Sequence, residues 1–114
     1  GGIRHRRAII PMSYYFEWNK EKEKIEFHPN EGRLLFVASI YDLFDEKMHF
    51  TMLTRAAVEG MEDVHHRMPL ILGRDQVEDW IMDEGRAKAL LIFQPQALRR
   101  EYECQQLRMD TLLS

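Results

Sequence analysis

The apolar run that decides the fold is Leu34-Leu35-Phe36-Val37-Ala38-Ser39-Ile40-Tyr41. A short apolar run between two turns is typical of a strand that is buried on both faces. The turn before it is Pro29-Asn30-Glu31-Gly32, and residues 42–47 form the turn after it. We therefore predict that residues 34–41 are the central strand of a sheet.

Further strand patterns lie on both sides of this run, and helical patterns follow them. Aromatic residues or alternating apolar residues predict strands over residues 8–10, 14–18, 25–28, 48–53 and 70–72. Apolar residues at helical spacing predict short helices over residues 54–61, 75–81 and 87–91, and another from residue 95. Met48 and Met52 are expected to fill the core. Strands followed by helices predict an α+β domain with a mainly antiparallel, partly barrel-like sheet and a few short helices.

Length, charge and cysteine content limit the kind of protein that this chain can be. The chain has 114 residues, which fits a single domain over residues 1–114, and its net charge of -3 gives no overall positive field for nucleic acid. We expect no membrane partner, because no apolar run approaches the roughly 18 residues of a membrane helix. Cys104 is the single cysteine, which excludes a disulfide within the chain and fits a reducing, cytoplasmic compartment.

A basic cluster precedes the first predicted strand and consists of Arg4, His5, Arg6 and Arg7. It can contact phosphates of a nucleic acid, or it can be a solvated arm, and the residue pattern leaves both open. Trp18 lies near a turn, where its ring can stack on a base or pack into the core. Trp80 lies on the apolar face of a predicted helix and is expected in the core.

Glu17 is a lone carboxylate between two aromatic residues, Phe16 and Trp18. In an extended strand its side chain points to the opposite face from both neighbours. It faces water if the aromatic residues are buried. If the aromatic residues are exposed instead, Glu17 faces inward, where burial would raise its pKa and suit it for proton transfer. Pattern alone favours the water-facing orientation.

A loop rich in functional groups, His65-His66-Arg67-Met68-Pro69, leads into the predicted strand over residues 70–72. Adjacent histidines in an extended chain point to opposite sides, so we expect one of the two to face a site. A histidine and an enclosed glutamate form a common pair for moving protons. Arg67 can grip a phosphate or pair with a carboxylate. The spacing of ligand residues predicts no metal site.

Several motifs in fixed order resemble the SOS-response-associated peptidase family, whose members are also called abasic-site processing proteins. The resemblance covers roughly residues 4–100. The motifs are Arg6-Arg7-Ala8-Ile9-Ile10-Pro11, Tyr15-Phe16-Glu17-Trp18, Phe50-Thr51-Met52-Leu53-Thr54, the segment from His65 to Leu72, and Trp80-Ile81. In the family pattern a cysteine stands at Ala8, a glycine at Tyr14, a tyrosine at Phe16 and an aspartate at His66.

The resemblance implies an α+β protein that binds single-stranded DNA and forms a covalent crosslink with abasic sites in the DNA damage response, without a cofactor. The family nucleophile is an N-terminal cysteine whose amine and thiol attack the sugar aldehyde. By resemblance, Glu17 and His65 are the catalytic proton-transfer groups. The family pattern together with the basic cluster gives Arg4, Arg6, Arg7, Trp18 and Arg67 as DNA-contacting residues.

This chain begins at Gly1 and has no cysteine there, so we expect a domain without the family's N-terminal segment. Loss of that segment would expose an apolar sheet edge and favour self-association. Two other functions stay open. One is a noncatalytic single-stranded DNA-binding module. The other is a peptidase, which would need Cys104 as its nucleophile.

Overall fold

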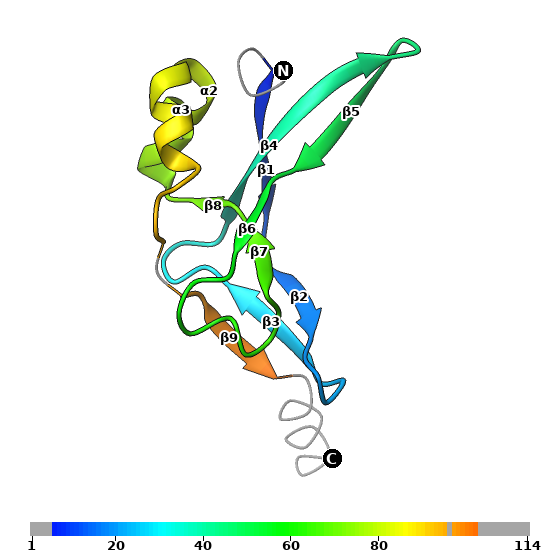
Figure 1. Ribbon diagram of the computed structural model, residues 1–114, viewed down its shortest axis with the longest axis vertical. Helices are drawn as coiled ribbons and strands as arrows, with labels where there is room; N and C mark the ends of the chain where they lie inside the picture. The colour runs from blue at the N-terminus through cyan, green and yellow to red at the C-terminus, as the bar shows by residue number, and fades with distance from the viewer. Residues whose placement is uncertain (1–5, 96, 103–114) are drawn as a thin grey trace.

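The computed structural model describes residues 6–95 and 97–102, which form three antiparallel sheets and two short helices (Figure 1). The first sheet has the strand order β1-β4-β5, and β8 also pairs with β4. The second sheet has the order β2-β3-β9, and β6 pairs with β7 in a separate hairpin. The predicted α+β class and antiparallel pairing are confirmed. The sheets are not closed on themselves, so the predicted partial barrel is wrong.

The central strand of the first sheet is β4 (Leu35–Phe44), as the apolar run predicts. It pairs with β1 (Arg7–Met12), β5 (Lys47–Met52) and β8 (Ile71–Leu72). The first half of β4 is covered on both faces, since Val37 belongs to one hydrophobic cluster and Ala38 to the other. These two clusters are the core of the described chain.

The second sheet consists of β2 (Tyr15–Trp18), β3 (Lys24–His28) and β9 (Arg99–Tyr102). Ile25 and Phe27 of β3 are buried in the same cluster as Val37, which joins this sheet to the first. The helix expected from residue 95 is absent over the described part of that region, and β9 pairs with β3 instead.

The helix predicted over residues 54–61 is also wrong. Residues Thr54–Ala56 form β6, which pairs in an antiparallel hairpin with β7 (Arg67–Pro69). The main chain continues this pairing, because the N–H of Leu70 donates to the carbonyl of Leu53 over 2.8 Å. Long-range strand pairing therefore overrides the local helical pattern here.

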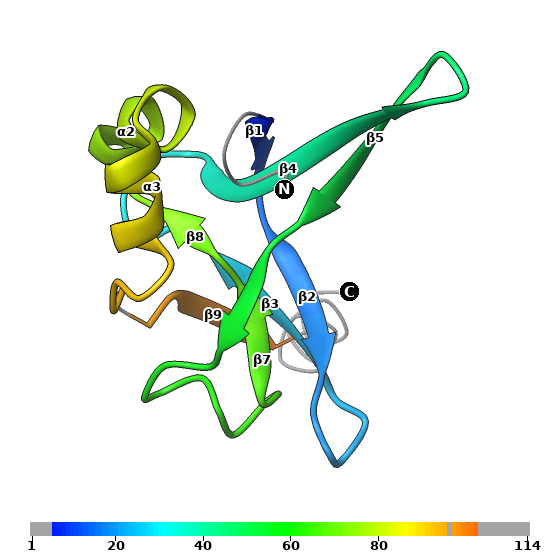
Figure 2. The same cartoon turned by 45° about the horizontal axis from the view of Figure 1, so that its top comes forward.

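Two short helices pack against the first sheet, and Figure 2 shows them beside β8 and the start of β4. A 3-10 turn, η1 (Arg74–Gln76), leads into α2 (Val77–Met82), and α3 (Glu84–Leu90) follows. Trp80 of α2 is fully buried and donates from Nε1 to the carbonyl of Ala8 over 2.9 Å, as its predicted core position requires. Across the described residues, no helix is long and apolar enough to span a bilayer.

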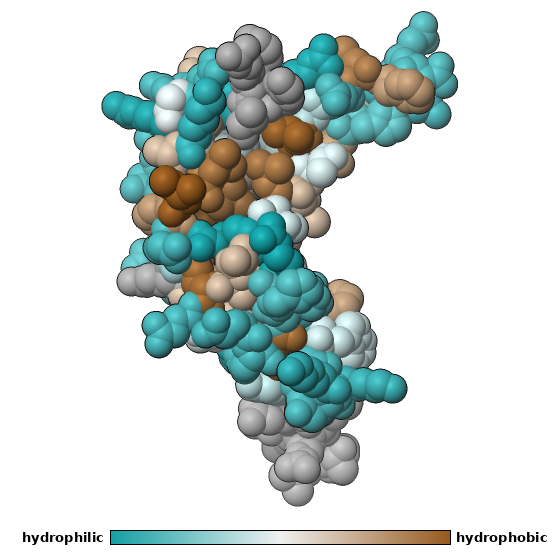
Figure 3. All heavy atoms as spheres, in the orientation of Figure 1, coloured by the Kyte–Doolittle hydropathy of each residue, from teal (hydrophilic) through white to brown (hydrophobic). Residues whose placement is uncertain are grey.

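The far half of β4 and all of β5 form a ribbon that projects from the body (Figure 1). One face of this β4–β5 ribbon is apolar, because Tyr41 lies opposite Phe50 and Leu43 lies opposite Met48. Leu43, Met48, Phe50 and Met52 are all exposed, so the core position expected for Met48 and Met52 is wrong. Figure 3 shows hydrophobic side chains on this ribbon among hydrophilic ones.

Candidate functional site

Glu17 lies on the face of β2 that packs toward the core. Phe16 and Trp18 point the other way and are 46% and 53% exposed, whereas Tyr15 and Glu17 are half-buried. Glu17 is paired with Ile25, and Tyr15 is paired with Phe27, and both β3 partners are buried. The water-facing orientation favoured by the sequence pattern is therefore wrong, and the inward orientation is correct.

Tyr15 gives this inner face a second ionisable group. Burial raises the pKa of the Tyr15 hydroxyl, and the neighbouring negative charge of Glu17 raises it further. The positive charge of Arg100 acts in the opposite direction. The phenol therefore stays protonated near neutral pH beside the Glu17 carboxylate. A phenol with a raised pKa is a poorer proton donor, so Tyr15 supplies a neutral hydroxyl on this face, and the carboxylate of Glu17 is the group there that can pass protons.

His65 is held by the main chain of Arg67. Its Nδ1 lies 3.1 Å from the N–H nitrogen and 3.2 Å from the carbonyl oxygen of Arg67. An unprotonated Nδ1 accepts from the N–H, and a protonated Nδ1 donates to the carbonyl. The ring therefore keeps a partner in either protonation state. The main chain of Arg67 therefore fixes the position of the ring.

His66 does not point to the opposite side from His65, contrary to our expectation. The two rings stack with 4.5 Å between their centroids and 22° between their planes. The backbone bends at His66 before β7 begins, so the extended geometry that we assumed does not hold there. His66 is exposed, and His65 is half-buried.

Arg100 of β9 connects the sheet of Glu17 to the loop that leads to His65. Its Nη1 donates to Oδ2 of Asp63 over 2.9 Å, and its Nη2 donates to Oδ1 over 3.2 Å. The same Nη2 donates to the carbonyl of Gly60. The hydrogen bond from Arg100 lowers the pKa of the Asp63 carboxyl. The sequence did not predict the contact between Arg100 and Asp63. The two residues are 37 positions apart, and the strand that carries Arg100 was not predicted.

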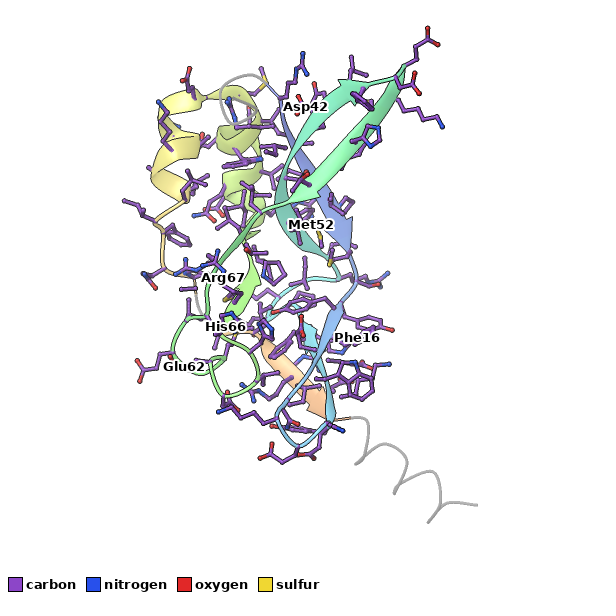
Figure 4. All side chains as sticks on the ribbon, turned by 45° about the vertical axis from the view of Figure 1, so that its right-hand side comes forward. Phe16, Asp42, Met52, Glu62, His66 and Arg67 are labelled. Carbon is purple, nitrogen blue, oxygen red and sulfur yellow. The ribbon has the colours of Figure 1, made fainter. Side chains whose placement is uncertain are left out.

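The core brings the two predicted catalytic residues into the same half of the molecule. Val64 and Met68, on either side of His65, pack in one cluster with Ile25 and Phe27, which pair with Glu17 and Tyr15. Figure 4 shows Phe16 on β2 and the His66 and Arg67 pair near the start of β7 at a similar level along the molecule.

The predicted DNA-contacting residues do not form one surface over the described part of the chain. Trp18 and Arg67 are exposed in the half that carries Glu17 and His65, and Arg67 donates from Nη2 to Oγ1 of Thr54 over 3.0 Å. Arg6 is exposed beside the β4–β5 ribbon and pairs with Asp42 at 2.7 Å. Arg4, like Cys104, lies outside the described residues.

Arg7 has a structural position that does not fit the predicted phosphate contact. It is only 9% exposed, and its guanidinium donates to the carbonyls of Trp80 and Ile81. Carbonyls in the last turn of a helix have no partner within the helix, and a cation satisfies them well. Arg7 therefore fastens α2 to β1.

One group of potential metal ligands lies elsewhere on the second sheet. Glu26, His28 and Glu101 place one donor atom each within 4.8 Å of one another. The sequence predicted no metal site because no ligand residues stood at the usual spacing, and the third donor, Glu101, comes from β9, which was not predicted.

Comparison with known proteins identifies the family. The family model described as SOS response associated peptidase (SRAP) matches residues 2–111. The chain belongs to the SRAP family. Among curated SRAP relatives, the chain is 33% identical over 91 residues to the abasic site processing protein YedK of Escherichia coli. That match covers 74% of this chain and 41% of YedK.

A yeast relative also bears on the family, and two solved structures share the fold. The abasic site processing protein YMR114C of Saccharomyces cerevisiae is 35% identical over 83 residues, or 67% of this chain and 23% of that protein. A Bacteroides thetaiotaomicron structure has a TM-score of 0.73 at 23% identity, covering 89% of this chain and 50% of the other. A Bordetella bronchiseptica structure has a TM-score of 0.75 at 21% identity, covering 89% and 56%. The chain therefore spans less than half of YedK and less than a quarter of YMR114C.

Proposed function

We propose that this chain supplies the proton-transfer part of an abasic-site processing protein. Membership of the SRAP family supports the role in abasic-site processing, as the names of the relatives indicate. The observation that carries the proposal is the inward-facing Glu17 beside Tyr15, with the His65 loop anchored to the same sheet through Arg100. The proposed target is an abasic site in single-stranded DNA.

The proposed chemistry begins with ring opening of the abasic sugar, which exposes an aldehyde. A neutral amine adds to the aldehyde carbon to give a carbinolamine, which must lose water to form an imine. A positioned acid donates the proton that leaves with this water. A thiol on the same nucleophile then adds to the imine carbon and closes a thiazolidine. Glu17 and His65 move the protons in these steps.

The proposed DNA surface is the outer face of β2 together with Arg67, and because β2 is at the edge of its sheet, the abasic sugar reaches Glu17 around that edge. Phe16 and Trp18 are exposed there, and their rings meet edge to face with 6.4 Å between centroids. Lys24 adds positive charge, because its Nζ lies 4.3 Å from the centre of the Phe16 ring. Exposed aromatic rings next to cationic groups are the usual platform for unpaired bases.

Binding of an abasic single-stranded oligonucleotide tests this surface. We expect the affinity to fall as salt increases, because phosphate contacts release counterions. Trp18→Ala should weaken binding by about 1–3 kcal/mol, the usual value of one base-stacking ring. Met82→Ala removes another exposed apolar side chain, on α2, and is the matched control. Salt-independent binding would rule out the proposed surface.

A second experiment adds free cysteine, whose amine and thiol can replace the N-terminal cysteine that is not at residue 1 of this sequence. The chain alone should give no denaturant-resistant adduct, but it should accelerate thiazolidine formation between free cysteine and a bound abasic site. Glu17→Gln should lower that acceleration by about 100-fold, the lower end of what a positioned acid or base contributes. Glu21→Gln, in the exposed turn after β2, should react like the native chain.

This experiment also distinguishes the second candidate, a noncatalytic DNA-binding module. The exposure of Phe16 and Trp18 favours binding whether or not catalysis occurs. Tight, salt-dependent binding without any acceleration in the native chain would support the module and reject the catalytic role of Glu17.

A further inference from the structure

Three side chains on the outer face of the second sheet converge on one point. Nε2 of His28 lies 3.0 Å from Oε1 of Glu26 and 3.5 Å from Oε2 of Glu101. Glu26 and His28 belong to β3, and Glu101 belongs to β9, which lies beside β3 (Figure 1). This face is opposite to the one that carries Glu17, so the cluster is separate from the proposed proton-transfer groups, and it is the face on which Phe16 lies opposite Glu26.

The spacing of the three donor atoms suits a small divalent ion. Nitrogen and oxygen ligands bind zinc at about 2.0–2.2 Å in a tetrahedral arrangement, which places neighbouring ligand atoms about 3.4 Å apart. The two measured separations lie on either side of that value, and all three donors lie within 4.8 Å of one another. The same two separations are the hydrogen bond of His28 to Glu26 and its ion pair with Glu101, which a bound ion would replace.

The sheet and its neighbours hold these donors in place. Glu26 and Glu101 are direct partners in the antiparallel register, and His28 lies two residues further along on the same face. The ring of Tyr14 stacks on His28 with 5.3 Å between centroids. Arg99 binds Oε1 of Glu101 at 2.6 Å, which leaves Oε2 directed toward His28. Such supporting contacts orient ligands in metal sites.

The two carboxylates on this face attract a cation in addition to their present partners, which are Arg99 at 2.6 Å from Glu101 and His28 at 3.0 Å from Glu26. Two carboxylates that lie directly opposite each other on neighbouring strands repel and destabilise the pairing. His28 and Glu26 are largely buried, with side chains 17% and 19% exposed, so solvent screens them only in part. A divalent ion between the carboxylates would neutralise both.

We propose that Glu26, His28 and Glu101 bind a Zn²⁺ ion, with water as the fourth ligand. The water enters from the side of Glu101, whose side chain is 47% exposed. Imidazole and carboxylate together are a ligand set that zinc accepts. The bound ion fastens β9 to β3 and so stabilises the sheet. This role goes beyond the proposed function and does not depend on it.

Titration calorimetry with Zn²⁺, followed by Co²⁺ absorption spectroscopy, tests the site in the full chain. We expect one Zn²⁺ per chain, a higher melting temperature with Zn²⁺, and the visible bands of four-coordinate Co²⁺. His28→Gln and Glu26→Gln should each weaken Zn²⁺ binding by about tenfold or more. Circular dichroism of each variant without metal establishes that it is folded.

His49→Gln and Glu31→Gln are the matched controls, because both side chains are exposed and lie outside the cluster. They should bind Zn²⁺ like the native chain. Absence of a one-to-one site would overturn the proposal, as would folded His28→Gln and Glu26→Gln variants that bind with native affinity.

Discussion

At the scale of single residues, the contact between Arg100 and Asp63 gives a test that depends on pH. The pKa of Asp63 is lowered in the folded chain, so its charged form stabilises the fold. This contribution is complete above the unfolded pKa of about 3.9 and is lost as pH falls through the folded pKa. Asp63→Asn should therefore lower the free energy of unfolding by about 0.5–1 kcal/mol at pH 7. The difference should shrink below about pH 4.

Urea unfolding of both chains at several pH values measures this difference. Asp45→Asn, in the turn of the β4–β5 ribbon, removes an exposed carboxylate without a comparable arginine contact and is the control. A difference between Asp63→Asn and the native chain that stays constant between pH 7 and pH 3.5 would contradict the assigned role of Arg100.

Ser39 gives a second prediction at this scale. Among the described residues, its Oγ is the buried side-chain polar atom that has no hydrogen-bond partner. A buried hydroxyl without a partner costs free energy that an apolar group of similar size does not. Ser39→Ala should therefore raise the free energy of unfolding by about 1 kcal/mol in urea titrations. Ser13→Ala at an exposed position is the control, and a clear loss of stability in Ser39→Ala would refute this account.

Single residues also show which parts of the site were predictable. The family pattern marks Glu17 and His65 from the sequence, but the direction of the Glu17 side chain depends on which face of β2 meets the core. Arg7 looked like part of a basic patch, and only the position of α2 reveals that it binds helix carbonyls. Arg100 gave no sequence signal at all, because its contacts come from distant segments.

At the scale of elements, the β4–β5 ribbon predicts self-association. Its apolar face continues from the core, and β5 is an edge strand of the first sheet. Exposed apolar edge strands promote pairing between chains. We expect the chain to form dimers or larger species as its concentration rises, and Leu43→Ser with Phe50→Ser should shift it toward the monomer. Sedimentation velocity measures this shift.

The opposite face of the ribbon provides the control for this experiment. Thr51 lies on that face, so Thr51→Ser should leave the association unchanged. A native chain that stays monomeric at high concentration would contradict the prediction, as would a double variant that associates as strongly as the native chain.

Elements differ in how far the sequence alone defined them. The apolar run of β4 and the Trp80 helix were predictable because burial dictates their composition. The hairpin of β6 and β7 and the edge strand β9 were not, because their partners lie far away in sequence. Local propensity is a weak guide where pairing partners decide the structure.

At the scale of the whole molecule, two hydrophobic clusters support an extended shape. The radius of gyration is 16.3 Å, whereas a compact chain of this length would have about 13 Å. We therefore expect hydrogen exchange to be uneven. Amides near Val37 and Ala38, where both clusters meet β4, should exchange slowest, and amides of β5 should exchange much faster.

Exchange followed by mass spectrometry tests this expectation with peptides from β4 and β5. Equal protection of the two strands would mean that the ribbon is as stable as the core. Peptides from β3 serve as an internal reference, because Ile25 and Phe27 are buried in the same cluster as Val37.

The position of Arg100 has a consequence for how the protein is made. The ribosome makes β2 with Glu17 first, then the loop with His65, and β9 after both. Until β9 emerges, the segment around Asp63 has no arginine to hold it against the second sheet. During this interval β2 and the His65 loop are both present, but the ion pair that joins the loop segment to the second sheet is not. A chain interrupted before β9 therefore lacks the contact that fastens the Asp63 segment to the second sheet.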